Sequence, residues 1–239
     1  MSFHTLSILI PCYNEENMIS VILKKIVETD CSLQKEIIVV NDCSSDNTAN
    51  IIEDFIHLND RSNIRLLHHA TNKGKGACIQ TALSVATGEV IIIQDADLEY
   101  SPFEYQKLLK PITDGFADVV YGSRFKGGDA HRVLFFLHTI GNKFLTFLSN
   151  IFTGLNLSDM ETGYKMFTTN VIKKITLKEK RFGFEPEITA KISKLKNIRI
   201  YEVGISYYGR TYQEGKKIKW KDGFRAIYCI FKYNLFSTK

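Results

Sequence analysis

Hydrophobic residues in the first half of the chain form short, unbroken runs separated by segments with a helical spacing of apolar positions. Five runs, rich in aliphatic and β-branched side chains, occupy residues 6–10, 36–40, 64–67, 90–93 and 118–121. Such runs are typical of strands covered on both faces. Helices are predicted between them at residues 17–29, 46–58 and 75–86. The alternation predicts an α/β fold whose doubly wound, mostly parallel sheet carries helices on both faces.

The second half of the chain is less regular. Its spacing predicts helices at residues 133–153, 186–195 and 220–235, a strand at 163–168 and an extended segment at 198–208. A polar, basic loop covers residues 209–219. Because no Pro- or Ser-rich linker and no repeat interrupts the chain, we expect a single domain over residues 1–215. Residues 216–239 would add a basic, aromatic C-terminal helix.

Composition narrows the class of protein. The 239 residues are 44% hydrophobic and 24% charged, which is typical of a soluble globular protein and excludes disordered, collagen-like and coiled-coil chains. The net charge of +5 conceals an asymmetry: residues 1–120 carry 9 basic and 17 acidic side chains, whereas residues 121–239 carry 22 and 9. The asymmetry indicates either a chain that handles cations or polyanions, or two halves with differently charged solvated faces.

Cysteine usage and targeting signals point to the cytoplasm. The five cysteines are scattered without a C-x-x-C pair, so we expect a reducing compartment and neither a disulfide framework nor a thiolate zinc site. The N-terminus lacks the basic region and long apolar core of a signal peptide. The most apolar stretch, residues 133–155, is interrupted by His138, Asn142 and Lys143 and does not predict a bilayer-spanning helix.

Two carboxylates at the end of the fourth run carry the most information. Asp95 and Asp97 stand two residues apart, and on an extended chain this spacing puts both on the same side. Like charges so placed repel unless a cation lies between them. Hard oxygen ligands favour Mg²⁺ or Mn²⁺, and Mg²⁺ usually binds through one or two carboxylates together with substrate phosphates. The pair therefore predicts a metal bridging the protein to a diphosphate, although strand ends are often acidic without one.

Polar clusters also follow three other predicted strands. They are P-C-Y-N-E at residues 11–15, D-C-S-S-D at 42–46 and G-S-R at 122–124. The carboxyl ends of parallel strands share one edge of the sheet, where ligands of such folds bind. Four clusters at one edge predict a single site.

As a set, the motifs P-x-Y-N-E, D-x-S-x-D, D-A-D and G-S-R resemble those of the family 2 glycosyltransferases. The resemblance covers residues 6–125, and the segment D-M-E-T-G-Y-K at 159–165 with the basic residues of 209–216 narrows it to the polyprenyl-phosphate branch, similar to the dolichol-phosphate mannose synthases. It implies a GT-A type, Rossmann-like fold. Residues 1–125 would form the nucleotide-sugar and metal half, and residues 126–215 the acceptor half.

The resemblance also implies roles for individual residues. The nucleotide sugar would be held by Pro11, Tyr13, Glu15, Asp42, Lys75, Asp95, Ala96 and Asp97. Asp42 would read the base. The metal, Mg²⁺ or Mn²⁺, would be held by Asp95, Asp97 and Glu99. In two departures from the family pattern, Asn41 stands where many relatives have Asp, and Glu99 where mannose synthases often have Gln. The base and the sugar therefore stay unassigned.

The acceptor can be argued from chemistry. A phosphate is already anionic at neutral pH and needs no general base, whereas a hydroxyl does. An acceptor phosphate beside a donor diphosphate instead needs its negative charge compensated, and Arg supplies this through bidentate pairs. The candidates are Arg124, Arg132, Arg210 and Lys216, with Lys217 beside the last. Asp159 has three open interpretations: a base for a hydroxyl acceptor, a group that orients arginines, or a helix cap.

Together these features predict an inverting, metal-dependent transfer of a hexose from a GDP- or UDP-sugar to a polyprenyl (dolichyl or undecaprenyl) phosphate. The catalytic group would comprise Asp95, Asp97, Arg124 and Asp159. The alternatives are a family 2 enzyme with a hydroxyl acceptor in cell-envelope glycan synthesis, or a non-catalytic nucleotide-sugar-binding subunit. A sugar nucleotidyltransferase fits less well, because residues 11–15 do not form a Gly-rich loop.

The Phe- and Leu-rich segment at residues 133–153 has two interpretations. It is either a core helix or an interfacial helix that brings a polyprenyl tail and the bilayer surface to the site, assisted by residues 220–232. The second interpretation predicts a peripheral protein on the cytoplasmic face of a membrane. No nucleic-acid partner is expected, while a homo-oligomer or a membrane-protein partner stays open.

Overall fold

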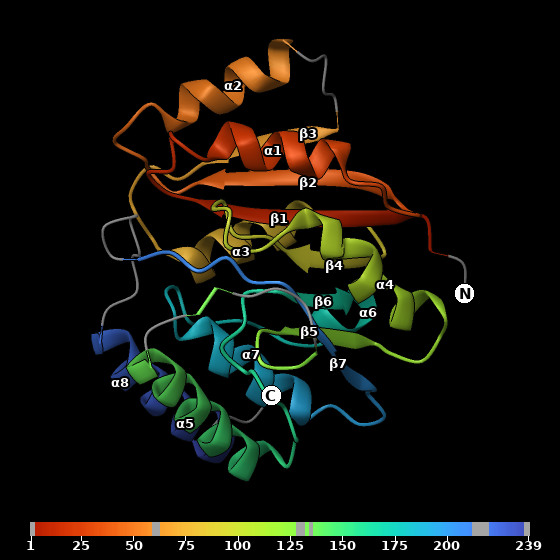
Figure 1. The fold of residues 1–239 in the computed structure, drawn as a ribbon, viewed down its shortest axis with the longest axis vertical. Helices are drawn as coiled ribbons and strands as arrows, with labels where there is room; N and C mark the ends of the chain where they lie inside the picture. Colours follow the sequence, from red (N-terminus) through yellow and green to blue (C-terminus); the bar gives the residue numbers. More distant parts are fainter. Residues whose placement is uncertain (1–2, 59–62, 128–131, 134–135, 212–219, 237–239) are drawn as a thin grey trace.

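One seven-stranded sheet runs through the computed structural model, which describes residues 3–58, 63–127, 132–133, 136–211 and 220–236 (Figure 1). Its strands are β1 (Thr5–Cys12), β2 (Gln34–Asn41), β3 (Ile64–His68), β4 (Val90–Ile93), β5 (Val119–Ser123), β6 (Lys165–Thr168) and β7 (Ile200–Gly204). Their order is β3-β2-β1-β4-β6-β5-β7, and every pairing is parallel except the two made by β6. The predicted doubly wound, mostly parallel sheet is confirmed.

Helices connect most of these strands. They are α1 (Ile19–Glu28), α2 (Thr48–Leu58), α3 (Lys75–Val85), α4 (Tyr105–Thr113), α5 (Phe136–Thr153), α6 (Thr169–Ile172), α7 (Phe184–Ser193) and α8 (Trp220–Phe231). A 3₁₀ turn at Pro102–Glu104 leads into α4, and a π-helical turn at Lys232–Phe236 follows α8. The predicted helices are confirmed to within a few residues at their ends. Residues 134–135, and residues 216–219 and 237–239 of the predicted C-terminal helix, lie outside the described part. The sequence did not predict α4 or α6.

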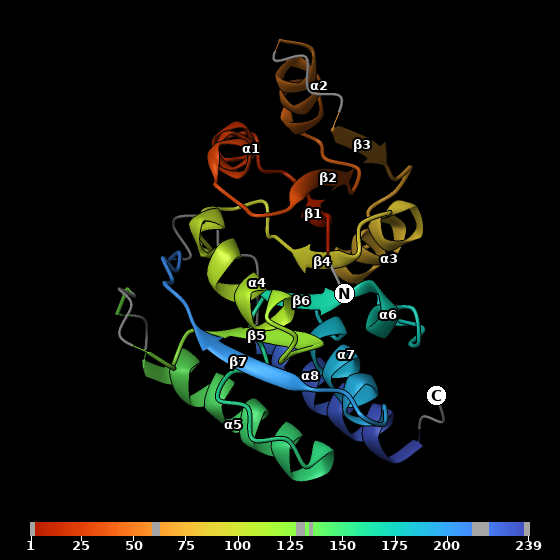
Figure 2. The same ribbon diagram turned by 90° about the vertical axis from the view of Figure 1, so that its right-hand side faces the viewer.

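Two hydrophobic layers cover the sheet. Alternate residues of β1 point to opposite faces, so Leu6 and Ile8 pack with α1 and α4, whereas Leu9 packs with α3 and α7. Figure 2 shows α1 and α4 on one side of the sheet and α3, α6 and α7 on the other. On the second side α5 and α8 form an outer layer against α7. They occupy the end of the molecule farthest from α2 (Figures 1 and 2).

The strand register brings the polar clusters together. Cys12 at the end of β1 lies opposite Asn41 at the end of β2, and Leu9 lies opposite Ile93 at the end of β4. The chain therefore leaves β1, β2, β4 and β5 at the same edge of the sheet. Because β6 runs in the opposite direction, it begins at that edge, where Lys165 is paired with β5. We call this edge the carboxyl edge.

The C-terminal helix packs onto the body of the protein. Ala226, Cys229 and Ile230 of α8 are buried, as is Tyr233 in the following turn. Within the described residues, no helix is both long and apolar enough to cross a membrane.

Candidate active site

The loops after β1 and β2 are fastened to each other at the carboxyl edge. The backbone N–H of Asn14, which has a left-handed φ of 49°, donates to Ser44 Oγ at 3.0 Å, and its side-chain oxygen accepts from Ser45 N at 2.8 Å. The N–H of Glu15 donates to Thr48 Oγ1 at 2.9 Å. The loops that carry the P-x-Y-N-E and D-x-S-x-D motifs therefore form one wall of the candidate site at the carboxyl edge.

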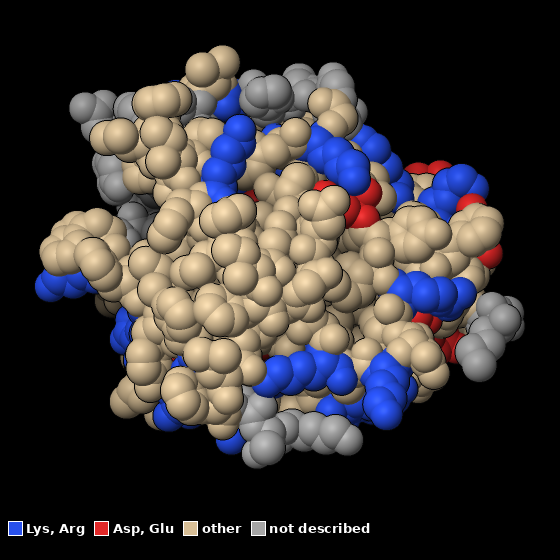
Figure 3. Space-filling model, turned by 90° about the horizontal axis from the view of Figure 1, so that it is seen from below, with Lys and Arg blue, Asp and Glu red and all other residues tan. Residues whose placement is uncertain are grey.

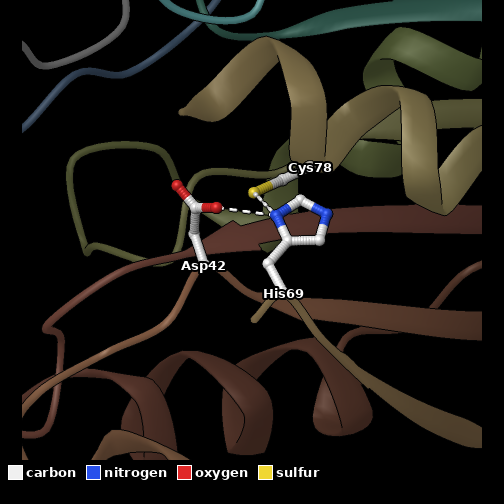
Figure 4. A group of neighbouring side chains, drawn as sticks. All are labelled: Asp42, His69 and Cys78. Atoms are coloured by element: carbon white, nitrogen blue, oxygen red, sulfur yellow. Dashed lines mark hydrogen bonds and ion pairs between the residues drawn. The ribbon is translucent and has the colours of Figure 1, made fainter. Parts of the chain in front are cut away.

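Asp42 is the buried centre of that wall. Its carboxylate accepts hydrogen bonds from the N–H groups of Lys73 (2.9 Å) and Gly74 (2.7 Å). It also accepts one from His69 Nδ1 at 2.7 Å (Figure 4). Burial alone would raise the pKa of Asp42, but these hydrogen bonds outweigh it and lower the pKa. The other ring nitrogen of His69 lies 2.9 Å from Thr81 Oγ1. Asp42 is thus an ionised acceptor fixed by the turn that begins α3.

Asp42, His69 and Cys78 also form the one group in the described residues whose Asp, His and Cys ligand atoms converge as for a metal, all within 4.8 Å of each other. The chemistry does not favour a cation there. Both ring nitrogens of His69 already have partners, and burial and the nearby Asp42 raise the pKa of the Cys78 thiol, so it stays protonated. We interpret the group as a hydrogen-bonded support for Asp42.

A chain of alternating charges lies deeper at the carboxyl edge. Lys75 Nζ is 2.7 Å from Asp95 Oδ1 and 3.3 Å from Glu185 Oε1, and Glu185 also pairs with the buried Lys165. Burial disfavours the charge on Lys75, but the two carboxylates outweigh it and raise its pKa. Gly163 allows the close approach of its loop, because a Cβ there would lie 2.6 Å from Asp95 Oδ2. Asp95 therefore lies between Lys75 of α3 and the loop before β6.

The other acidic residues surround Arg210. Its guanidinium is 2.6 Å from Asp97 Oδ2, 3.3 Å from Glu99 Oε1 and 3.5 Å from Glu15 Oε2. Glu99 also accepts hydrogen bonds from the Arg210 N–H (2.9 Å) and from Tyr207 Oη (2.7 Å). Burial, followed by the charges of Asp95 and Glu99, raises the pKa of Asp97. Among the described residues, three carboxylates of this cluster thus share the guanidinium of Arg210.

The residues predicted to hold a metal fit a cation. Asp97 is buried beside two other carboxylates. The repulsion among such like charges is relieved only by protonation or by a nearby positive charge. The donors are all carboxylate oxygens, which suit Mg²⁺ or Mn²⁺. In this structure Arg210 and Lys75 supply the positive charge, and the oxygens of Asp95, Asp97 and Glu99 do not converge on one point as the Asp42 group does.

A second arginine is fixed nearby. Arg124 Nε and Nη2 each lie 2.7 Å from the two oxygens of Asp159, and the Arg124 N–H donates to Oδ2 at 3.0 Å. Asp159 is fully buried. Of the three interpretations of Asp159, the geometry is that of a group that orients an arginine. The guanidinium of Arg124 also lies over the ring of Tyr207, at 5.2 Å.

The segment from Tyr207 to Arg210 gathers the predicted acceptor residues. Arg132 donates from its backbone to Tyr207 O at 2.9 Å and from its side chain to Gly209 O at 3.0 Å. Arg124, Arg132 and Arg210 therefore meet around one short segment, although they are far apart in sequence. Lys216 and Lys217 lie outside the described residues.

The remaining predicted residues also lie at the carboxyl edge. Pro11 is the penultimate residue of β1, and Tyr13 is exposed just beyond that strand. Ala96 is buried between Asp95 and Asp97.

Sequence reasoning missed three charged residues of the site. Glu185 pairs with both Lys75 and Lys165. Glu161 is only partly buried, but its oxygen Oε1 is buried without a hydrogen-bond partner among the described residues. Burial and the nearby Glu185 raise the pKa of Glu161 to about 7. The acidic start of α7, F-E-P-E, was a signal for Glu185, because acidic residues favour helix N-termini. Lys165 ends the D-M-E-T-G-Y-K segment, but nothing local indicates that it is buried and paired with Glu185.

Sequence comparison identifies the family. The model for Glycosyl transferase family 2 matches residues 7–176, which include the carboxyl-edge motifs from Pro11 to Lys165. The chain belongs to this family. As a family 2 protein it is a glycosyltransferase, as predicted, and the motifs that indicated the family are those that the sheet brings together.

Several similar proteins are named as dolichyl-phosphate glycosyltransferases. A dolichyl-phosphate beta-glucosyltransferase of Trichomonas vaginalis is 30% identical over 233 residues, covering 89% of this chain and 68% of its own. One of Dictyostelium discoideum is 29% identical, with the same coverage. A UDP-N-acetylglucosamine--dolichyl-phosphate N-acetylglucosaminyltransferase of Methanococcus voltae is 26% identical and covers 93% of both chains. These relatives agree with the predicted polyprenyl-phosphate branch of the family.

Solved structures confirm the predicted fold. Glucosyl-3-phosphoglycerate synthase from Mycobacterium tuberculosis, in complex with Mn²⁺ and uridine-diphosphate-glucose, superposes with a TM-score of 0.75 at 15% identity, covering 99% of this chain and 81% of that chain. A complex of the same enzyme with Mn²⁺, uridine-diphosphate and phosphoglyceric acid gives a TM-score of 0.74.

Proposed function

We propose that this family 2 glycosyltransferase transfers a hexose, with inversion, from a nucleotide diphosphate sugar to a polyprenyl phosphate at the cytoplasmic face of a membrane. Residues 1–125 would bind the donor and Mg²⁺ or Mn²⁺, and residues 126–215 the acceptor. A UDP-sugar is the first donor to test, because the Methanococcus voltae relative is named for one.

The observation that carries the proposal is the gathering of arginines beside an acidic cluster. Arg124, Arg132 and Arg210 meet at Tyr207–Arg210, next to Asp97 and Glu99. Asp159, the one residue predicted as a base for a hydroxyl acceptor, has both oxygens engaged by Arg124. An anionic acceptor needs charge compensation and no base, which is what this arrangement supplies.

On the donor side, Asp42 would accept a hydrogen bond from the nucleotide base. Hydrogen bonds from Lys73, Gly74 and His69 fix the direction in which its carboxylate would face the base. Mg²⁺ or Mn²⁺ held by Asp95, Asp97 and Glu99 would act as a Lewis acid toward the leaving diphosphate. Lys75, already between Asp95 and Glu185, adds positive charge beside that position.

The transfer itself is a displacement in line. A phosphate oxygen of the acceptor attacks the anomeric carbon from the face opposite the diphosphate, and the bond from that carbon to the diphosphate oxygen breaks. The electron pair leaves with the nucleoside diphosphate, so no proton has to move. Arg124 and Arg210 would hold the incoming anion against the repulsion of the leaving one.

The test is a transfer assay with a water-soluble short-chain prenyl phosphate, radiolabelled UDP-glucose, UDP-N-acetylglucosamine or GDP-mannose, and Mn²⁺ or Mg²⁺. We expect a labelled prenyl phosphate sugar with one donor. Asp97→Asn should lower turnover by about 100-fold or more and weaken Mn²⁺ binding seen by electron paramagnetic resonance. Its melting temperature should not fall, because the substitution removes one of several crowded carboxylates.

Asp114→Asn is the matched control, since Asp114 is a partly exposed surface residue paired with Lys110 at 2.7 Å, and it should behave as the wild type does. Full turnover by Asp97→Asn would refute the metal assignment. Transfer to a sugar hydroxyl but not to any prenyl phosphate would refute the acceptor.

A further inference from the structure

Helix α5 has its apolar side turned outward. The residues buried on its inner side include Thr146 and Ser149, with Leu145 and Leu148 only partly buried. Its large apolar residues are exposed at spacings of three or four, the signature of one helix face: Phe136, Leu137, Ile140, Phe144, Phe147 and Ile151. The core-helix interpretation of this segment therefore does not hold, because a core helix would bury these side chains.

Helix α8 continues the same surface. Trp220, Phe224, Tyr228, Phe231, Leu235 and Phe236 are exposed along α8 and the turn that follows it. The two helices lie side by side in both ribbon views, and the rings of Phe152 and Phe231 meet edge to face at 5.0 Å (Figures 1 and 2). We call these two stripes together, Phe136 to Ile151 and Trp220 to Phe236, the α5–α8 apolar face. Contiguous apolar surface of this kind marks an interaction site.

Basic residues border this face. Figure 3 shows a broad surface without charged side chains, with Lys and Arg along its margins and few acidic residues near it. The sequence of α5 contains Lys143 but no Asp or Glu. On α8, which also carries Asp222, Lys221 lies over the ring of Trp220 at 5.8 Å. Arg225, half-exposed and paired with Glu179, lies over the ring of Tyr228 at 4.9 Å. Aromatic and basic side chains arranged around an apolar centre suit the interface of a bilayer.

We propose that the α5–α8 apolar face binds the surface of a bilayer that contains anionic lipids. The inference rests on the proposed function, because an acceptor anchored in a membrane requires the protein to reach the bilayer surface. A second copy of this chain fits less well, because pairing two such faces would bring their basic margins together. Anionic headgroups would instead neutralise these margins while the aromatic rings enter the acyl boundary.

The face also lies close to the site. Lys143 of α5 is 5.8 Å from the centre of the Phe125 ring, and the guanidinium of Arg124 is 5.7 Å from the same ring. One aromatic ring thus separates the apolar face from the arginine proposed to receive the acceptor phosphate. A lipid phosphate at the level of the headgroups would be near Arg124 when the face is docked.

Vesicle flotation at low salt tests the proposal, with phosphatidylcholine vesicles that do or do not contain phosphatidylglycerol. The wild type should float with the anionic vesicles and be released by high salt. Phe147→Glu on α5 and Phe224→Glu on α8 should each lower the partition coefficient by roughly tenfold or more. Phe116→Glu is the matched control, because Phe116 is 58% exposed, against 62% for Phe147 and 66% for Phe224. It precedes β5, at the edge of the sheet opposite the carboxyl edge.

Two further measurements separate the outcomes. With a soluble short-chain prenyl phosphate all three variants should keep wild-type turnover, whereas with polyprenyl phosphate in vesicles the two face variants should lose it in parallel with flotation. A wild type that does not float, or face variants that float normally, would overturn the docking proposal even if transfer occurs. A lipid-free dimer in sedimentation that Phe147→Glu dissociates would assign the face to a second copy instead. Normal flotation without any transfer would overturn the proposed function alone.

Discussion

At the scale of single residues, the Arg124–Asp159 pair decides how the acceptor side is interpreted. Asp159 is fully buried and accepts two hydrogen bonds from the guanidinium and one from the backbone of Arg124. Burial disfavours the charge on Arg124, but Asp159 outweighs it and raises the pKa of the guanidinium. A carboxylate occupied in this way orients its partner and is poorly placed to take a proton from a hydroxyl.

Exchanging either partner should therefore impair acceptor binding in the same way. We expect Asp159→Asn and Arg124→Lys each to raise the KM for prenyl phosphate by roughly tenfold, with a smaller effect on kcat. The double variant should lose less than the sum of the two, because both changes break one interaction. Steady-state kinetics over a range of pH measures this. A large loss of kcat in Asp159→Asn at unchanged KM, with Arg124→Lys unaffected, would instead identify Asp159 as a base.

The sequence predicted which residues lie at the site better than how they contact one another. Asp42, Asp95 and Arg124 were identifiable because each follows an apolar run, and parallel strands end at one edge. That Arg210 would lie among Asp97, Glu99 and Glu15 was not predictable, because the contact depends on how the distant loop after β7 folds back. Lys165 was missed for the same reason, since its partner Glu185 is on another element.

At the scale of elements, the start of α3 is clamped by a strap at residues 178–181. The N–H of Ala77 donates to Lys180 O at 3.0 Å, and Gln80 Nε2 donates to Glu179 O at 3.2 Å. Two glycines allow this approach, since a Cβ on Gly76 would lie 2.2 Å from Glu179 O and one on Gly74 would lie 2.6 Å from Lys180 O. The strap thus fixes the turn that holds Asp42 and Lys75.

Gly76→Ala should consequently destabilise the protein by about 1–3 kcal/mol, because the added methyl group displaces backbone that has no room to move. It should also raise the KM for the donor, since the displaced turn carries Lys75. Gly141→Ala in α5 is the matched control: a Cβ there meets nothing within 4 Å, so it should stabilise by about 0.5–1 kcal/mol through helix propensity. Urea unfolding and donor kinetics measure both. Equal effects of the two substitutions would contradict the clamp.

The fold was predictable where local pattern determines the element and not where partners do. Continuous apolar runs identified five strands and their parallel crossovers. The antiparallel direction of β6 was not predictable, because a buried run reads the same in either direction and the pairing with β4 and β5 decides it. For α5, the amphipathic spacing allowed two interpretations, since periodicity identifies an apolar face without saying whether protein or another phase covers it.

At the scale of the whole molecule, acidic side chains from the first half of the sequence pair with basic side chains from the second half. The acidic first half supplies the strand-end carboxylates, and the basic second half places Arg210 among them. The basic C-terminal helix is itself fixed by one acid. Glu179 accepts hydrogen bonds from Arg225 (2.7 Å), Lys232 (3.0 Å) and Tyr233 Oη (2.8 Å), while its backbone belongs to the strap.

This contact predicts how acid affects the stability of the molecule. Burial alone would raise the pKa of Glu179, but the hydrogen bonds from Arg225, Lys232 and Tyr233 lower it to about 2. A carboxyl whose pKa falls on folding stabilises the folded state above its unfolded pKa, about 4.5, and this stabilisation disappears as the pH falls toward 2. Glu179→Gln should therefore lower the free energy of unfolding by about 1–3 kcal/mol at neutral pH, less if solvent screens the half-exposed Arg225.

The difference between the wild type and Glu179→Gln should be constant above about pH 5 and shrink steadily below it. Urea unfolding over a series of pH values measures it. Glu28→Gln is the control, because Glu28 forms an exposed pair with Lys24 at 3.8 Å and should change stability by less than about 0.5 kcal/mol at any pH. A difference for Glu179→Gln that does not vary with pH would show that the side chain contributes packing rather than charge.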